Sequence, residues 1–280
     1  MDNTVTAFHE GERRAQVLAG VAAPSSTFIR SFMTEQHRTF FASLPYVVLG
    51  VLSPDGWPVA TLATGVPGFL SSPDDITLHL AWYPPSGDPV AEALAPGSPM
   101  AILGIEFATR RRNRANGIVL ANDTDGIRMR VRQSFGNCPK YIRTREPRSL
   151  LRLPGAVERY PALDAETRDV ITSAGTFFVA SCASSVVHGG MDVSHRGGPS
   201  GFVQVDGDVL TVPDYPGNRY FNTFGNFLEN PRAGLLFINF ENGDLLHLTG
   251  EASVSWSDAG RSFDVSVRNV IRRRSVLTLD

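Results

Sequence analysis

The chain has 280 residues, of which 42% are apolar and 19% are charged, and its net charge is -2. This length suits one long domain or two of about 130 residues, and the lack of any basic block argues against nucleic-acid binding. Cys138 and Cys182 are too few for a metal site or a disulfide framework. No apolar stretch approaches the ~20 residues that span a bilayer, and residues 1–11 show no signal peptide. We therefore expect a cytoplasmic protein with no membrane partner.

Short strand-like runs dominate the first half. Residues 45–52 are apolar and β-branched and end at a Pro-Asp-Gly turn, so residues 59–64 are expected to return as a hairpin. Residues 76–82 and 100–107 predict two further strands. In residues 127–131 apolar positions alternate with arginines, which is the pattern of a strand with one buried face.

Three segments predict helices. Residues 34–44 carry phenylalanines at helical spacing, and residues 88–95 open with the Asp-Pro pair of a first helical turn. Residues 164–174 form the third. Between the two halves, residues 143–163 are rich in proline and arginine, which indicates a linker.

The second half repeats motifs of the first at a spacing of 133 residues. The Gly-Phe pair at residues 68–69 recurs at 201–202, and a strand that ends in glycine at Gly117 recurs with its end at Gly250. Two matched pairs at one spacing and in one order indicate a duplicated all-β unit, packed as a pseudo-dimer of small barrels.

The expected organisation is therefore two units joined by a linker. Residues 1–145 would form a first barrel with an N-terminal helical segment, residues 146–163 the linker, and residues 164–280 a second barrel. Motifs of other enzyme classes are absent: the chain has no G-x-G-x-x-G, no P-loop, no H-E-x-x-H and no G-x-S-x-G, and its six histidines have no metal-ligand spacing.

One candidate binding segment lies at residues 188–198. It brings Ser194, His195 and Arg196 to the end of an expected strand, and two glycines follow that let the backbone approach a ligand closely. The alternative is an ordinary hairpin turn with solvated polar residues.

Two other segments have a similar character. Residues 213–226 combine asparagine, glycine and Arg219 near an expected helix start, a composition that favours a phosphate. Residues 134–145 contain Lys140, the sole lysine of the chain. A surface loop and a linker, respectively, are the alternatives from spacing alone.

At these segments the chain resembles the pyridoxamine 5'-phosphate oxidase-like family of FMN-binding split barrels, in its tandem-duplicated form. The matching stretches are FHEGE at residues 8–12, RRRNRANG at 110–117, SFGNCPKYI at 134–142, SHRGG at 194–198, PDYPGNRYFNTFGN at 213–226 and NPRAGLLF at 230–237. The resemblance implies a mainly β fold of two tandem Greek-key split barrels, with about six antiparallel strands each and a few short helices. It also implies FMN in the groove between the barrels.

The resemblance implies one flavin site, mainly on the second barrel. Its implied cofactor-binding residues are Ser194, His195, Arg196, Gly197, Pro213, Asp214, Gly217, Asn218, Arg219, Asn222, Asn137, Lys140 and Tyr141. Charged and amide groups among them would hold the phosphate, and Tyr141 and Gly197 would contact the ring together with Phe202. Lys140 or His195 would act as a positive donor at the ring edge. No catalytic residue and no metal ligand stand out.

The implied function is an FMN-dependent oxidoreductase or oxidase acting on a small molecule. The chain lacks the C-terminal substrate motif of authentic pyridoxamine phosphate oxidases, so vitamin B6 oxidation is not expected. Electrons would come from NAD(P)H, from a separate flavin reductase or from the substrate. Alternatives are a non-enzymatic FMN carrier, a haem-binding barrel with His195 or His247 as axial ligand, and a cofactor-free scaffold. A homodimer is left open.

Overall fold

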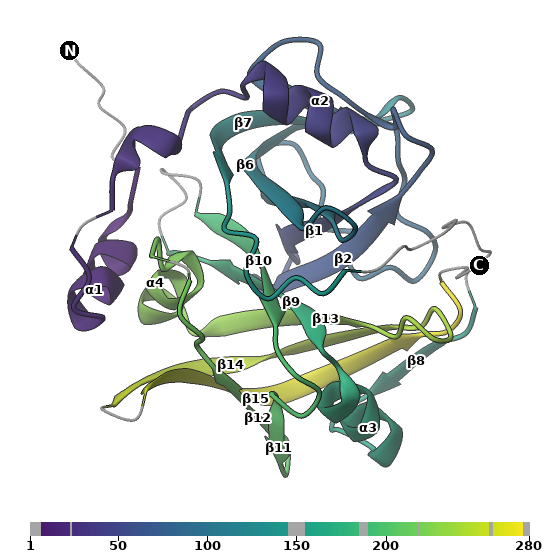
Figure 1. Cartoon of the computed structure of the whole chain (residues 1–280). Helices are drawn as coiled ribbons and strands as arrows, with labels where there is room; N and C mark the ends of the chain where they lie inside the picture. Colours follow the sequence, from purple (N-terminus) through teal and green to yellow (C-terminus); the bar gives the residue numbers. More distant parts are fainter. Residues whose placement is uncertain are drawn as a thin grey trace.

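The computed structural model describes residues 7–22, 24–144, 155–184, 190–217, 219–257 and 260–276. These residues form two antiparallel sheets with a few short helices at their margins (Figure 1). The expected mainly β fold is therefore confirmed. The first half of the chain builds one sheet and the second half builds the other.

The first half holds three helical segments and seven strands among its described residues. They are α1 (Glu10–Leu18), η1 (Ser26–Phe28), α2 (Glu35–Ser43), β1 (Tyr46–Leu52), β2 (Pro58–Thr64), β3 (Leu70–Ser71), β4 (Thr77–Leu80), β5 (Pro99–Glu106), β6 (Arg111–Asp123) and β7 (Gly126–Gly136).

The described part of the second half also consists mainly of strands, with two short helices. Its elements are β8 (Val157–Tyr160), α3 (Ala165–Ser173), β9 (Thr176–Cys182), β10 (Met191–Gly197), β11 (Gln204–Asp206), β12 (Val209–Pro213), α4 (Asn222–Glu229), β13 (Arg232–Ile238), β14 (Leu245–Ser257) and β15 (Gly260–Arg273).

The two sheets have the same strand order. The first runs β2-β1-β5-β6-β7-β4-β3 and the second runs β10-β9-β13-β14-β15-β12-β11, with β8 added beside β15. Each described order runs from one edge strand to another, so neither sheet closes into a complete barrel by hydrogen bonding. The sheets have seven and eight strands, where the sequence led us to expect about six.

The strand register also matches between the halves. Leu103 pairs with Arg114 across β5 and β6, and Leu236 pairs with His247 across β13 and β14. A register shift follows in both sheets, between Asn116 and Gly117 in the first and between Thr249 and Gly250 in the second. Arg114 and His247 therefore occupy equivalent places.

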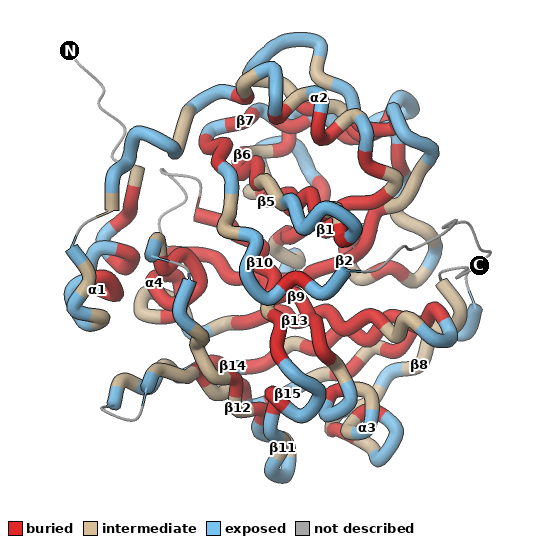
Figure 2. Tube along the Cα trace, in the orientation of Figure 1, coloured by how far each residue is buried: buried red, intermediate tan, exposed pale blue. Residues whose placement is uncertain are grey.

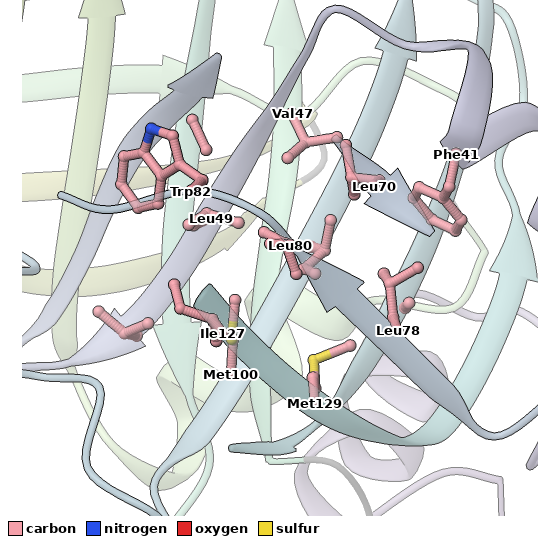
Figure 3. Close-up of a cluster of buried hydrophobic side chains, with 14 of the residues drawn as sticks. Phe41, Val47, Leu49, Leu70, Leu78, Leu80, Trp82, Met100, Ile127 and Met129 are labelled. Atoms are coloured by element: carbon pink, nitrogen blue, oxygen red, sulfur yellow. The ribbon is translucent and has the colours of Figure 1, made fainter. Parts of the chain in front are cut away.

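Each half has its own apolar core, and a third core lies between the halves. The core of the first half gathers side chains from β1, β4, β5, β7 and α2, among them Phe41, Leu80 and Met129 (Figure 3). The core between the halves joins side chains such as Val48 and Phe178 from facing strands of the two sheets. The buried strands therefore meet at the centre of the molecule (Figure 2).

Two of the three predicted helices are confirmed. Thr34 caps α2 by accepting a hydrogen bond from the His37 backbone, and Asp164 caps α3 in the same way from Thr167. The helix predicted over residues 88–95 is wrong: that segment is a series of tight turns. Its Asp88 carboxylate is buried and bonds Thr61 and Arg273, which holds the segment against both halves.

The segment expected to link the two units takes part in the second sheet. Its residues 157–160 form β8, which pairs antiparallel with β15, while residues 145–154 lie outside the described part of the chain. At the other end, α1 belongs to the first half by sequence but packs on α4 of the second (Figure 1).

Close packing of the halves requires glycine at position 234. A Cβ atom built there would overlap the carbonyl group of Pro58 on the facing strand β2. We predict that Gly234→Ala lowers the free energy of unfolding by about 1–3 kcal/mol, because the added methyl group overpacks a buried contact. Thermal or urea unfolding measures this change.

Gly136→Ala is the matched control for that substitution. Its added Cβ would meet only Asn113 Oδ1, at an ordinary contact distance of 3.4 Å, so its effect should stay within about 0.5 kcal/mol. Equal stabilities of the two variants would contradict the close approach of β13 to β2.

Candidate functional site

A cavity of about 550 Å³ opens where the two halves meet. Its walls come from β6 and the segment after β7, from β10 and the loop after β12, and from the chain between α1 and η1. The lining residues are Ala22, Pro24, Ser25, Phe28, Arg112, Arg114, Gly136, Asn137, Cys138, Lys140, Tyr141, Ser194, His195, Arg196, Gly197, Phe202, Pro213, Tyr215, Gly217, Arg219 and Tyr220. Both halves are therefore needed to build it.

Arg114 fixes the inner wall of the cavity. It extends from β6 into the second half, where its guanidinium donates to Asp192 at 2.7 Å, to Ser194 at 2.7 Å and to Asn222 at 3.1 Å. The Arg114–Asp192 ion pair is almost fully buried. A buried charge requires such pairing, because desolvation alone would cost several kcal/mol.

The neighbouring Arg112 donates to Nδ1 of His195 at 2.9 Å. Because arginine only donates, Nδ1 must be the unprotonated nitrogen, and the ring proton lies on Nε2. Burial, together with nearby arginines, lowers the pKa of His195 well below its usual value, so the ring is neutral at pH 7. His195 lines the cavity, and its buried Nε2 has no hydrogen-bond partner among the described residues, so this N–H is an unused donor.

Arg112 is a partly buried cation without an acidic partner among the described residues. Burial and the nearby Arg114 and Arg196 lower its pKa to about 9, which still leaves it charged at pH 7. Arg196 differs, since Asp214 pairs with it at 3.3 Å and also binds Arg261 at 2.9 Å. The positive charge of Arg112 thus remains available to an anion.

The lining is strongly one-sided in charge. Among the described residues, five basic side chains line the cavity and no aspartate or glutamate does: Arg112, Arg114, Lys140, Arg196 and Arg219. Since two of them are neutralised by buried aspartates behind the wall, the remaining three give the cavity a net positive charge. The cavity therefore suits an anionic ligand rich in hydrogen-bond acceptors.

Aromatic side chains make the opposite wall. Tyr141 stacks on Tyr215 with ring centroids 5.4 Å apart, and its hydroxyl donates to the Pro216 carbonyl at 2.9 Å. Tyr141 has a φ of 64°, an uncommon conformation for a residue other than glycine, and such strain tends to gather at functional sites. The carbonyl of Tyr141 lies so close to Gly197 that a Cβ there would overlap it.

Most of the predicted cofactor-binding residues line this cavity. The ten that do are Asn137, Lys140, Tyr141, Ser194, His195, Arg196, Gly197, Pro213, Gly217 and Arg219. Asp214 and Asn222 lie behind the wall, where they bind Arg196 and Arg114 respectively. Asn218 lies outside the described residues. Of the two candidates for a positive donor, Lys140 and His195, burial and the nearby arginines lower the pKa of His195 and keep it neutral, which leaves Lys140.

Arg112, Arg114 and the lining residues 22–28 were not predicted from the sequence. The two arginines lie in the RRRNRANG stretch, where alternation along β6 puts both on one face. The aromatic residue at the mouth, Phe28, has no recognisable motif around it. Among the described residues, no cluster of His, Cys, Asp and Glu is arranged to hold a metal, and no helix is long and apolar enough to cross a membrane.

A second layer of polar groups supports the site from behind. Glu12 of α1 accepts a hydrogen bond from the side-chain nitrogen of Asn222. The side-chain oxygen of Asn222 accepts a hydrogen bond from Arg114. His9 bonds Glu229 at 2.7 Å and Asn226 at 2.8 Å, which holds α1 on α4. The N-terminal segment is thereby tied to the arginine at the cavity wall.

The comparison with protein families finds a match over the second half of the chain. Residues 163–276 match the family model described as pyridoxamine 5'-phosphate oxidase, which confirms the resemblance for that half. No curated protein matches the chain.

Solved structures with similar regions include HupZ of Group A Streptococcus, at 14% identity over 38% of this chain and 90% of that chain, with a TM-score of 0.30. An FAD-binding protein from Mesorhizobium loti has 14% identity over 42% of this chain and 99% of that chain, with a TM-score of 0.30. An FAD-binding protein from Mycobacterium smegmatis has 14% identity over 42% and 98%, with a TM-score of 0.28.

Glu12 should make stability depend on pH. Burial raises the pKa of this carboxyl from 4.5 to about 7, so the folded state holds the proton more tightly than the unfolded state does. Stability from this group is therefore greatest below pH 4.5 and is lost as the pH rises through 7, by about 3 kcal/mol at most. Glu12→Gln should flatten that decline, as measured by urea unfolding at pH 5 and pH 8.

Glu35→Gln is the control, because Glu35 is an exposed glutamate in the first turn of α2. It should leave the difference in stability between pH 5 and pH 8 as it is in the wild type. A Glu12→Gln protein with the wild-type difference would contradict the buried, proton-retaining state of Glu12.

Proposed function

We propose that this protein binds one FMN in the cavity between its halves and uses it as an oxidoreductase on a small-molecule substrate. The observation that carries the proposal is the lining of five basic side chains and no acidic one. A phosphate monoester is close to a dianion at pH 7 and needs such donors. The family match of residues 163–276 supports the same ligand.

The remaining lining fits the other parts of FMN. The flavin ring is flat and presents acceptor atoms along one edge, and the cavity offers aromatic faces from Tyr141 and Tyr215 with an unused donor at His195 Nε2. Arg112, which has no acidic partner among the described residues, gains the most from an anion. These features favour FMN over an uncharged ligand of similar size.

When bound, FMN supplies the hydride or electron transfer, and this chain supplies binding and orientation. Arg112, Lys140 and Arg219 attract the phosphate, and Arg114 keeps the two halves in the spacing that the cavity requires. His195 holds a proton at Nε2 and can donate a hydrogen bond from it. Tyr141 and Phe28 line the same cavity and provide aromatic surface for the ring.

The C-terminal arginines support a reaction other than vitamin B6 oxidation. Arg272 binds Asp164 and Glu166, and Arg274 binds Glu158 and Asp244. These side chains are used in ion pairs around β8 and α3 and are not free to hold a substrate. We therefore propose a small-molecule substrate other than a B6 vitamer, with NAD(P)H or a separate reductase as electron donor.

The histidine tautomer argues against haem at this cavity. Because Arg112 occupies Nδ1 of His195 and the proton lies on Nε2, that ring has no lone pair to offer an iron while the hydrogen bond lasts. We further propose that the two sheets arose by tandem duplication and that they supply within one chain the two sides of a single flavin site.

The visible absorption spectrum tests the proposal. Purified protein is mixed with excess FMN, passed over a desalting column and scanned. Flavin bands at one FMN per chain are expected, followed by bleaching with NADH, NADPH or a flavin reductase and recovery in air. If the protein retains no flavin, the proposal of FMN as cofactor is refuted. If bound flavin changes redox state with none of these donors, the proposed oxidoreductase activity is refuted.

Arg112→Gln should weaken FMN binding about 10–100-fold, since a hydrogen bond to a charged group contributes about 1.5–3 kcal/mol. Arg128→Gln makes the same change of charge at an exposed surface pair with Asp123 and should leave binding unchanged. Fluorescence titration of FMN measures both. Equal dissociation constants for the two variants would place the phosphate elsewhere.

A further inference from the structure

A second cavity, of about 730 Å³, also lies between the two halves, at the place that the repeat makes equivalent to the first. Its walls come from the β1–β2 turn, from residues 87–92 and from β14 and β15. His247 lines it from the register position that Arg114 occupies in the first cavity. The repeated frame thus produces two cavities whose linings differ.

His247 presents an acceptor where the first cavity presents donors. Its Nδ1 lies 2.9 Å from the backbone carbonyl of Ala60, and a carbonyl can only accept, so Nδ1 carries the proton and Nε2 has the lone pair. Burial lowers the pKa of His247 to about 4, so the ring is neutral at pH 7. The side chain is 3% exposed, and its buried Nε2 has no hydrogen-bond partner in the part of the chain that the structure describes.

The charges of the second cavity also differ from those of the first. Asp55, Asp88 and Glu92 line it together with Arg159 and Arg268. Asp88 is already bound by Thr61 and Arg273, and Arg268 pairs with Glu251 at 2.8 Å. The lining therefore has no surplus of positive charge to hold a phosphate dianion.

The apolar part of this lining includes ring side chains. The indole of Trp57 and the rings of Pro54 and Pro89 line the same cavity as His247, and the guanidinium of Arg232 lies over the Trp57 ring at 4.9 Å. An aromatic side chain of this kind suits contact with another planar ring. A metal ion is not favoured at His247 Nε2, because the described residues contain no group of ligands arranged for one.

We propose that this second cavity binds a neutral, planar nitrogen heterocycle whose N–H group donates a hydrogen bond to His247 Nε2. The buried lone pair requires a hydrogen-bond donor, the lack of surplus positive charge disfavours a phosphate, and the ring side chains of the lining favour a planar ligand. This site is separate from the proposed flavin site, so binding of the heterocycle is tested independently of FMN binding.

The test uses adenine, cytosine and nicotinamide as probes, since each is neutral, planar and carries an exocyclic NH2 group. Trp57 lines the cavity, so its fluorescence should be quenched saturably by at least one probe. His247→Phe should weaken that binding about tenfold or more, because it leaves the N–H of the ligand buried and unpaired. His79→Phe, at an exposed histidine on β4, should bind as the wild type does.

The wild-type protein provides a second readout if His247→Phe does not fold. In protein labelled with ¹⁵N-histidine, a donor arriving at Nε2 should shift the Nε2 resonance of a neutral histidine protonated at Nδ1. Absence of saturable quenching by all three probes would overturn the proposal. So would equal affinity in His247→Phe and the wild type, or saturation that leaves every histidine resonance unmoved.

Discussion

Arg114 leaves β6 of the first half and ends among Asp192, Ser194 and Asn222 of the second, where the Arg114–Asp192 pair is nearly inaccessible to water. A charge in such a place is tolerated only while its partners stay in reach, so the pair sets the distance between the two halves. The cavity wall, the position of α4 and the link to Glu12 of α1 all depend on that distance. Removing one partner would leave a buried charge unpaired and would disturb both the packing and the site.

The two cavities occupy equivalent places in the repeated fold but differ in the hydrogen bonds that their histidines can make. In the first, Arg112 takes the Nδ1 lone pair of His195, and the ring is left with a donor at Nε2. In the second, the Ala60 carbonyl takes the Nδ1 proton of His247, and the ring is left with an acceptor. The hydrogen-bond partner at Nδ1 thus determines whether the Nε2 atom of each histidine can donate a hydrogen bond to a ligand or accept one. The surrounding charges follow the same division, since acidic side chains line only the second cavity.

Local pattern was sufficient for much of the fold. Alternation in residues 127–131 and the turn after residues 45–52 follow from short-range chemistry. The repeat at 133 residues is a similarity between distant segments, and the matching strand orders of the two sheets agree with it. The segments around residues 194–198 and 134–142 also pointed to the cavity. The helix expected over residues 88–95 failed because Asp88 is held by distant partners, which no local pattern reveals.

The central claim is that a phosphate-bearing flavin lies between the halves among the basic side chains. A crystal structure of the protein grown with FMN tests it most directly. The account predicts density for one FMN per chain in the cavity of Arg112 and His195, with its phosphate within hydrogen-bond distance of Arg112, Lys140 or Arg219 and a flavin acceptor facing His195 Nε2. Flavin density in the cavity of His247, or ordered crystals whose first cavity holds only water at saturating FMN, would contradict it.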